Sequence, residues 1–175
     1  MYYNNSQRKY KNAFDLAEDS GRAKALRVLK SIDLFDGDYN DYKIVPMQNN
    51  CHWDFEIRDS LTGELIAVVE AKDRKFPSDD YKITNDGGAQ LESLKYEELK
   101  RVANEYDIMA LLLCTFTDNR YIIWDINNTD VSEDVRFCNK TTAILTDKIE
   151  KHCYYFPLSE AIFFGHIPPD KLSEQ

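Results

Sequence analysis

The sequence lacks the features of membrane-spanning and disulfide-stabilised secreted proteins. It has no apolar run near the length that crosses a bilayer, and its first residues, Met1 to Asn5, hold no hydrophobic signal region. Its four cysteines are scattered and show neither the CxxC nor the HxxxH spacing of zinc sites, so they are interpreted as free thiols. We therefore expect a cytoplasmic, intracellular protein that does not bind membranes.

The sequence also lacks the motifs of several large enzyme classes. It contains no GxxxxGK[ST] loop, no GxGxxG turn and no GxSxG elbow. Its only three histidines, His52, His152 and His166, stand in no recognisable arrangement with a serine or a cysteine. Candidate chemistry must therefore come from carboxylates and amines.

Net positive charge is missing too, since the formal net charge is −9. This argues against a protein that coats nucleic acid nonspecifically, because binding to phosphates depends on Lys and Arg. The charge is uneven, however. Residues 1–30 carry seven basic and three acidic groups, a balance of +4, which leaves −13 for the rest of the chain. This basic segment, which includes Arg22 and Lys24, is either a solvated helix face or a face turned toward phosphates.

What the chain does have is enough apolar sequence for one core. It has 175 residues, of which 43% are hydrophobic, with eleven Tyr and nine Phe. We expect a single domain with its core at about residues 10–127, an extension at about 128–167 and a tail at 168–175.

The segment 51–75 holds the most informative pattern. Residues 51–59 alternate between apolar and polar side chains, which is typical of a strand with one buried face. Residues 60–63 form a turn, and Leu65 to Val69 are apolar on both faces, as in a strand covered on both sides. This strand ends in Glu70-Ala71-Lys72. The hairpin can therefore bring Asp54 beside Glu70 and Lys72.

Two neighbouring carboxylates repel each other, and a divalent cation removes that conflict. Mg²⁺ prefers hard oxygen ligands, usually one or two carboxylates with waters and phosphate oxygens, and a nearby ammonium can stabilise charge on a phosphate under attack. The alternative is structural. Glu70 and Lys72 would then form only a weak ion pair at an exposed sheet edge.

Asp54, fifteen intervening residues and Glu70-Ala71-Lys72 together resemble the D…(D/E)-x-K signature of the PD-(D/E)XK nuclease superfamily. The resemblance implies a restriction-endonuclease-like αβββαβ core and Mg²⁺-dependent phosphodiester cleavage, with Mn²⁺ as a substitute. Asp54, Glu70 and the carbonyl of Ala71 would hold the metal, and Lys72 would be the catalytic lysine. Trp53 stands where the proline that names the motif would be.

The same resemblance suggests two further site residues. Glu18, on the first helix, would complete the metal site, although Asp15 and Asp19 compete for that role. Gln90, in the first turn of a helix predicted at residues 89–106, resembles an accessory glutamine, although a glutamine at a helix start is otherwise ordinary. Lys95 is the other candidate on the same helix, although the interpretation as a surface residue is preferred.

The implied partner is DNA, and RNA is not excluded. Candidate nucleic-acid contacts are Arg22, Lys24, Arg74, Lys75 and Lys82, the last in a loop predicted at residues 76–88. A homodimer would suit a duplex substrate. The alternative function is a catalytically inactive protein with the nuclease fold that acts as a binding or inhibitory module.

The remaining periodicity predicts an α/β fold, a mixed central β-sheet flanked by helices. The predicted elements are a helical region at 6–32, strands at 42–48, 51–59 and 64–72, a helix at 89–106, and strands at 108–116 and 121–126. Because a helix connects them, the strands at 64–72 and 108–116 should be parallel neighbours. Beyond residue 127 we expect a strand-like segment at 135–145 and a short helix near 159–164.

Overall fold

The computed structural model describes residues 20–35, 41–47, 51–78, 88–139 and 148–169. A helix that covers residues 20–29 in this description is called the N-terminal helix below. The elements that follow are β1 (Tyr42–Pro46), β2 (Phe55–Asp59), β3 (Leu65–Asp73), β4 (Gly88–Glu92), α2 (Ser93–Tyr106), β5 (Met109–Thr115), β6 (Arg120–Asp125), β7 (Ser132–Asn139), β8 (Lys148–Pro157), the 3₁₀ turn η2 (Leu158–Glu160) and β9 (Phe163–His166). The expected α/β class is confirmed.

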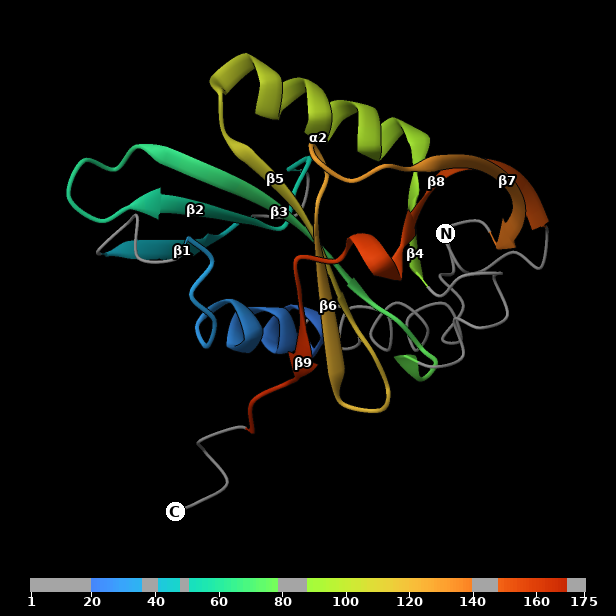
Figure 1. The fold of residues 1–175 in the computed structure, drawn as a ribbon, viewed down its shortest axis with the longest axis horizontal. Coiled ribbons are helices and arrows are strands. Elements are labelled where there is room, and N and C mark those ends of the chain that lie inside the picture. Colours follow the sequence, from blue (N-terminus) through green and yellow to red (C-terminus); the bar gives the residue numbers. More distant parts are fainter. Residues whose placement is uncertain (1–19, 36–40, 48–50, 79–87, 140–147, 170–175) are drawn as a thin grey trace, which may run out of the picture.

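Six strands form the central sheet, in the order β1-β2-β3-β5-β6-β9 (Figure 1). The β3–β5 pair is parallel, as predicted from the intervening helix, and every other neighbouring pair in this sheet is antiparallel. The expected order of one helix, three strands, a helix and a further strand is present, with β4 inserted before α2. β1 carries Pro46 and lies at a sheet edge, where a residue without a backbone N–H is tolerated.

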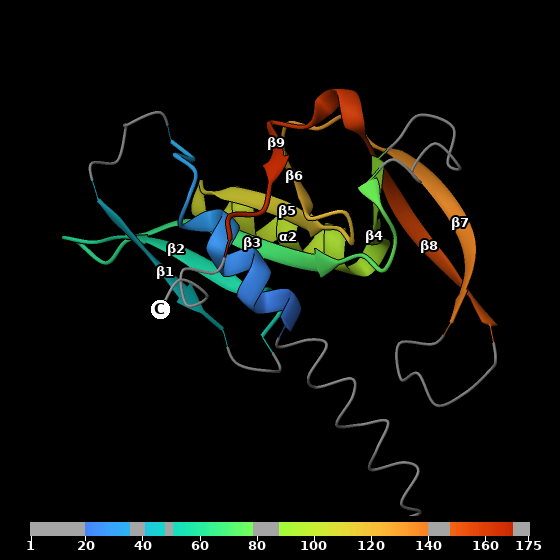
Figure 2. The same cartoon turned by 90° about the horizontal axis from the view of Figure 1, so that it is seen from below.

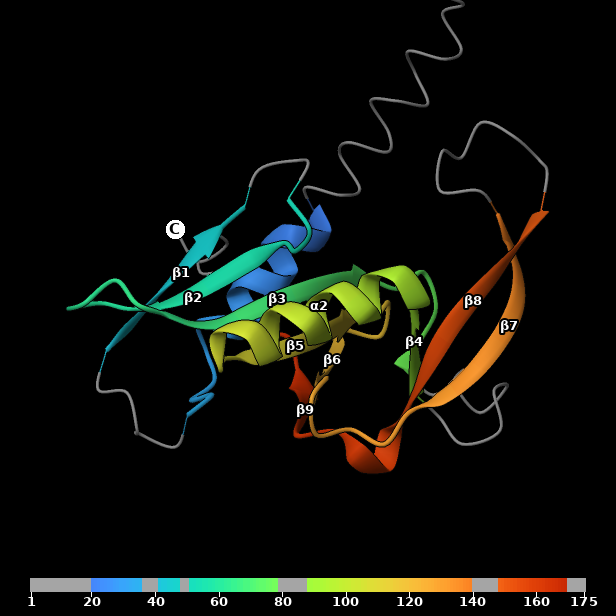
Figure 3. The same cartoon turned by 90° about the horizontal axis from the view of Figure 1, so that it is seen from above.

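The two helices cover opposite faces of this sheet (Figures 2 and 3). The N-terminal helix buries Val28 and Leu29 in one cluster with Val69 of β3, and α2 buries Leu99 in the other cluster with Val68. Adjacent residues of β3 thus point to opposite cores, which explains its continuous apolar run. Within the described ranges, no helix is long and apolar enough to cross a bilayer.

A second sheet of three strands has the order β4-β8-β7 and projects from the body beside the end of β3 (Figure 2). Its strand β4 corrects the prediction for Gln90, which lies on this strand opposite Tyr155 and not in the first turn of a helix. The helix begins only at Ser93. Gly88 permits the pairing, because a Cβ there would lie 1.9 Å from the carbonyl oxygen of Phe156.

The C-terminal extension is more strand-rich than predicted. The short helix expected near 159–164 is wrong, because the 3₁₀ turn η2 ends at Glu160 and the strand β9 follows. β9 pairs with β6 and extends the central sheet. Phe163 of β9 packs against the cluster that contains Val28 and Leu29 of the N-terminal helix. The strand-like segment expected at 135–145 corresponds to β7, which begins earlier, at Ser132.

Candidate active site

The candidate site lies at the carboxyl end of β3, where β2 begins beside it. Asp54 directly precedes β2, and its backbone N–H donates to the carbonyl of Val69 over 2.9 Å. Its side-chain oxygen Oδ2 accepts the backbone N–H of Ala71 over 2.8 Å. The Asp54 carboxylate is therefore held against the residue that separates Glu70 from Lys72, and the hairpin brings the three groups together as the sequence predicts.

Glu70 and Lys72 form a close ion pair on the α2 side of β3. The Nζ of Lys72 lies 2.7 Å from Oε1 of Glu70, whose side chain is only 3% exposed. Burial alone lowers the pKa of Lys72, but the charge and hydrogen bond of Glu70, with a further contribution from Asp54, raise this pKa above its usual value. The pairing with Glu70 therefore favours the protonated, positively charged form of Lys72.

Lys95, interpreted from the sequence as a surface residue, reaches the same carboxylate. It lies in the first turn of α2, and its Nζ is 3.1 Å from Oε2 of Glu70 and 2.7 Å from the carbonyl oxygen of His52. Oε2 is buried and has no hydrogen bond in the described part of the chain, so this contact is a charge interaction. The sequence offers Lys95 only as an alternative candidate to Gln90 and does not predict its contact with Glu70, because α2 and β3 meet only through the fold.

Arg22 of the N-terminal helix lies at the other carboxylate. Its Nη2 donates to Oδ1 of Asp54 over 2.8 Å, and its Nη1 donates to the carbonyl of Met47 over 2.9 Å. Both oxygens of Asp54 thus accept hydrogen bonds, one from Arg22 and one from Ala71. Arg22, proposed from the sequence as a nucleic-acid contact, is placed as a partner of a candidate metal ligand.

Lys24 and Lys75, two further nucleic-acid candidates, meet at Asp73, the last residue of β3. Asp73 accepts hydrogen bonds from Lys24 over 3.0 Å, from Lys75 over 2.6 Å and from the hydroxyl of Thr115 over 2.8 Å. Burial raises the pKa of Asp73, but these three bonds outweigh it and hold the pKa below its usual value. Gly21 allows the helix to lie this close, because a Cβ there would be 2.8 Å from the Cβ of Asp73.

Arg74 and Gln90 meet through the backbone. The Nη2 of Arg74 donates to the carbonyl oxygen of Gln90, which ties the end of β3 to β4 and the second sheet. The positive charge of Arg74 also acts on Lys72 and opposes its protonation, so this pair lies beside the site. Glu18 and Lys82 lie outside the described residues.

The described residues hold two carboxylates and three cations at the centre of the site. Asp54 and Glu70 face Arg22, Lys72 and Lys95. No group of three His, Cys, Asp or Glu side chains that could hold a metal ion occurs within the ranges that the structure describes. A metal ion here would therefore need ligands beyond the two carboxylates.

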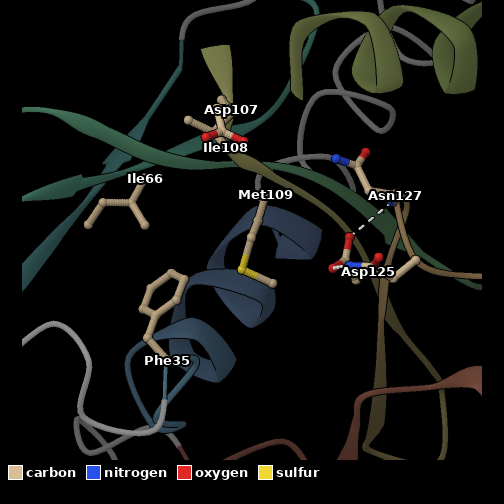
Figure 4. Close-up of a pocket in the computed structure, with 8 residues that line it drawn as sticks. Phe35, Ile66, Asp107, Ile108, Met109, Asp125 and Asn127 are labelled. Carbon is tan, nitrogen blue, oxygen red and sulfur yellow. Dashed lines mark hydrogen bonds between the residues drawn. The ribbon is translucent and has the colours of Figure 1, made fainter. Parts of the chain in front are cut away.

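A surface pocket lies elsewhere, at the opposite end of the central sheet (Figure 4). Its lining includes Ile66 near the start of β3, Met109 at the start of β5 and Asp125 at the end of β6. Asp125 is satisfied locally, since it accepts a hydrogen bond from the backbone N–H of Asn127 over 3.0 Å. The pocket is separate from the cluster of Asp54, Glu70 and Lys72.

Comparisons with known proteins add one similar structure. No family model matches the chain, and no curated protein matches it. A solved structure of D212, a nuclease from a fusselovirus, is similar over 92% of this chain and 88% of that one, with a TM-score of 0.39 and 12% sequence identity. At that level of similarity, the function proposed below rests on the site geometry alone.

Proposed function

We propose that this protein is a Mg²⁺-dependent nuclease, a DNA endonuclease of the PD-(D/E)XK type. The observation that supports this proposal best is the contact of Asp54 with the backbone N–H of Ala71. It holds one acid beside a second, buried acid and an ammonium, on adjacent strands of the sheet. Two acids and an ammonium grouped in this way suit phosphodiester hydrolysis.

The residues fit a magnesium ion. Glu70 is 2% exposed and offers Oε2, a buried oxygen without a hydrogen bond in the described part of the chain. Asp54 and the carbonyl of Ala71 would supply further hard oxygens, and water and a substrate phosphate would complete the octahedron that Mg²⁺ prefers. Glu18 stays a proposed ligand. A bound Mg²⁺, or Mn²⁺ in its place, would polarise the phosphate and lower the pKa of a water molecule.

The chain's own groups would position the reactants. Lys72 carries a full positive charge within reach of Glu70, so it can donate hydrogen bonds to an attacking water and to a phosphate oxygen as negative charge develops there. Ala71 orients Asp54 through its N–H, which fixes one acid relative to the other. Gln90 stays a proposed accessory residue. Its role was inferred from a place at the start of a helix, but Gln90 lies on β4, the strand that directly precedes α2.

The substrate proposal follows from the cations around the site. Lys24, Lys75 and Arg74 lie at the end of β3, and with Lys82 they would contact the backbone of a DNA strand. RNA has the same phosphodiester chemistry and stays an alternative substrate. We propose a homodimer for cleavage of both strands of a duplex, since two-fold symmetry matches that of the substrate.

The test is cleavage of plasmid and branched DNA with Mg²⁺ by the wild type and by Lys72→Ala. We expect Lys72→Ala to slow cleavage by about 10²- to 10³-fold, the loss typical of a donor that stabilises developing charge. Lys100→Ala is the control, because Lys100 lies on the same helix as Lys95 and its Nζ donates to the Tyr96 hydroxyl over 2.9 Å, outside the site. Equal activity of wild type and Lys72→Ala would exclude this function.

A second candidate is a binding or inhibitory protein with the nuclease fold and no turnover. Its supporting observation is that each carboxylate already has a cationic partner, Arg22 at Asp54 and Lys72 at Glu70. Such pairs stabilise the ends of β2 and β3 without a metal ion. Absence of cleavage by the wild type with Mg²⁺ and with Mn²⁺, together with intact DNA binding, would favour this candidate.

A further inference from the structure

Lys95 is placed by three elements of the fold. Its side chain starts on α2, donates to the carbonyl of His52 in the segment before β2, and reaches Glu70 on β3. An ammonium has three N–H donors, and these two oxygens occupy at most two of them. The side chain is 31% exposed, so the remaining donor can be reached from solvent.

The charges at the centre of the site favour an anion. Asp54 and Glu70 contribute two negative charges, and Arg22, Lys72 and Lys95 contribute three positive ones. Without Lys95 these contributions would balance. The side chain of Lys72 is 37% exposed and that of Lys95 is 31% exposed, while Glu70 between them is almost fully covered. Solvent therefore meets two ammonium groups and hardly any of the carboxylate.

We propose that Lys95 is a phosphate-binding residue and that, with Lys72, it lets this site bind a nucleic-acid phosphate before any divalent cation arrives. The proposal rests on the nuclease function proposed above and adds the order of binding. A phosphate oxygen accepts charge-assisted hydrogen bonds from both ammonium groups, which releases their hold on Glu70. The phosphate then adds negative charge beside Glu70, which favours a divalent cation at that carboxylate.

The local excess of cations also explains how a chain with a net charge of −9 can bind a polyanion. Attraction to phosphates falls off within about 10 Å at ordinary salt, so the local excess of cations outweighs the distant acidic surface. Mg²⁺ alone, by contrast, meets a site whose carboxylates are already neutralised. The proposal therefore predicts weak Mg²⁺ binding in the absence of a phosphodiester.

The test measures binding of a fluorescent DNA oligonucleotide in EDTA, by anisotropy, where no cleavage can occur. We expect Lys95→Gln to weaken this binding by about five- to tenfold at low salt, the effect of losing one charged phosphate contact. Lys95→Arg keeps the charge and should retain most of the affinity. Lys100→Gln, on the same helix, should bind like the wild type, and far-ultraviolet circular dichroism of all variants checks that each is folded.

Two outcomes would overturn the proposal. One is a Lys95→Gln variant that is folded and binds like the wild type in EDTA. The other is calorimetry that shows Mg²⁺ binding equally tightly with and without the oligonucleotide. The nuclease function fails separately: a wild type that never cleaves, yet binds DNA through Lys95 in EDTA, disproves turnover and leaves the phosphate site standing.

Discussion

At the scale of single residues, the charge state of Lys72 decides what it can do. Glu70 and Asp54 raise its pKa above the usual 10.5 although burial opposes them. A raised pKa means that the protonated form, and the stability of its ion pair, are present below pH 10.5 and are lost only as the pH rises through the higher folded value. While Glu70 holds it, Lys72 is thus protonated below pH 10.5.

We therefore expect the rate of cleavage to show no alkaline decline caused by Lys72 between pH 7 and about pH 9.5. The measurement is kcat/KM against pH for the wild type and for Lys72→Arg, whose guanidinium stays charged throughout. A decline with an apparent pKa below 9 in the wild type that disappears in Lys72→Arg would show that Lys72 titrates in the working range, against this prediction.

Gly21 carries a second prediction at this scale. In most helices, replacing glycine with alanine stabilises by about 0.5–1 kcal/mol. Here a Cβ would lie 2.8 Å from the Cβ of Asp73, an atom fixed to the backbone of β3, so the helix would have to move away. We expect Gly21→Ala to lower the free energy of unfolding by about 1–3 kcal/mol, as overpacking does. Urea unfolding measures it.

The control for Gly21→Ala is Ser20→Ala, because Ser20 is an exposed position in the same helical turn. It should leave the urea midpoint nearly unchanged. A Gly21→Ala variant that is as stable as the wild type would mean that the N-terminal helix is not held against Asp73 as described.

At the scale of elements, the second sheet is joined to the body through Phe156 of β8. Phe156 is fully buried, and its ring centroid lies 6.0 Å from that of Tyr96 on α2 and 6.1 Å from that of Trp124 on β6. One side chain thus packs the second sheet against the helix and the central sheet. Its loss would leave a cavity where three elements meet.

We expect Phe156→Ala to lower the free energy of unfolding by about 3–5 kcal/mol, the usual cost of removing a buried phenylalanine. Phe164→Ala is the matched control, because Phe164 on β9 is 78% exposed and its removal opens no cavity. Chemical denaturation of both variants measures the difference. Equal, small losses in the two would show that β8 does not pack on the core.

The elements also show what sequence patterns predict well. β3 and β5 were predicted because their buried residues form continuous apolar runs, and their parallel pairing followed from the helix between them. β4 was mistaken for the start of a helix. Its five residues, Gly88 to Glu92, run into α2 without a turn, and Glu92 makes no side-chain cap that would mark where the helix begins.

In the site, too, local patterns predict some contacts and miss others. Asp54, Glu70 and Lys72 were predicted to meet because they lie on one hairpin, within reach of local reasoning. The contact of Lys95 with Glu70 could not be predicted, because it depends on how α2 crosses the sheet, which no local pattern encodes. The contact of Arg22 with Asp54 could not be predicted either, because the partner of a guanidinium depends on which acid the fold places beside it, and its role as a nucleic-acid contact stays a prediction.

At the scale of the whole molecule, positive and negative charges are unevenly distributed. The formal net charge of −9 contrasts with a site whose two carboxylates are met by three cations. Both helices contribute to this local excess from opposite faces of the sheet, Arg22 from one and Lys95 from the other. Under the proposed function, nucleic acid would therefore bind at one end of β3, and the acidic remainder would disfavour nonspecific coating.

The pairing of β4 with β8 affects how the chain acquires this arrangement. Gly88 faces Pro157, so β4 finds its partner only across about seventy residues that are synthesised later. Asp54, Glu70 and Lys95 are synthesised before β8, the partner strand of β4. Pairs of strands that are distant in the sequence also form slowly. β4, whose Gln90 carbonyl accepts a hydrogen bond from Arg74, can therefore pair only after β8 has been synthesised, and until then the residues of the proposed site lack this support.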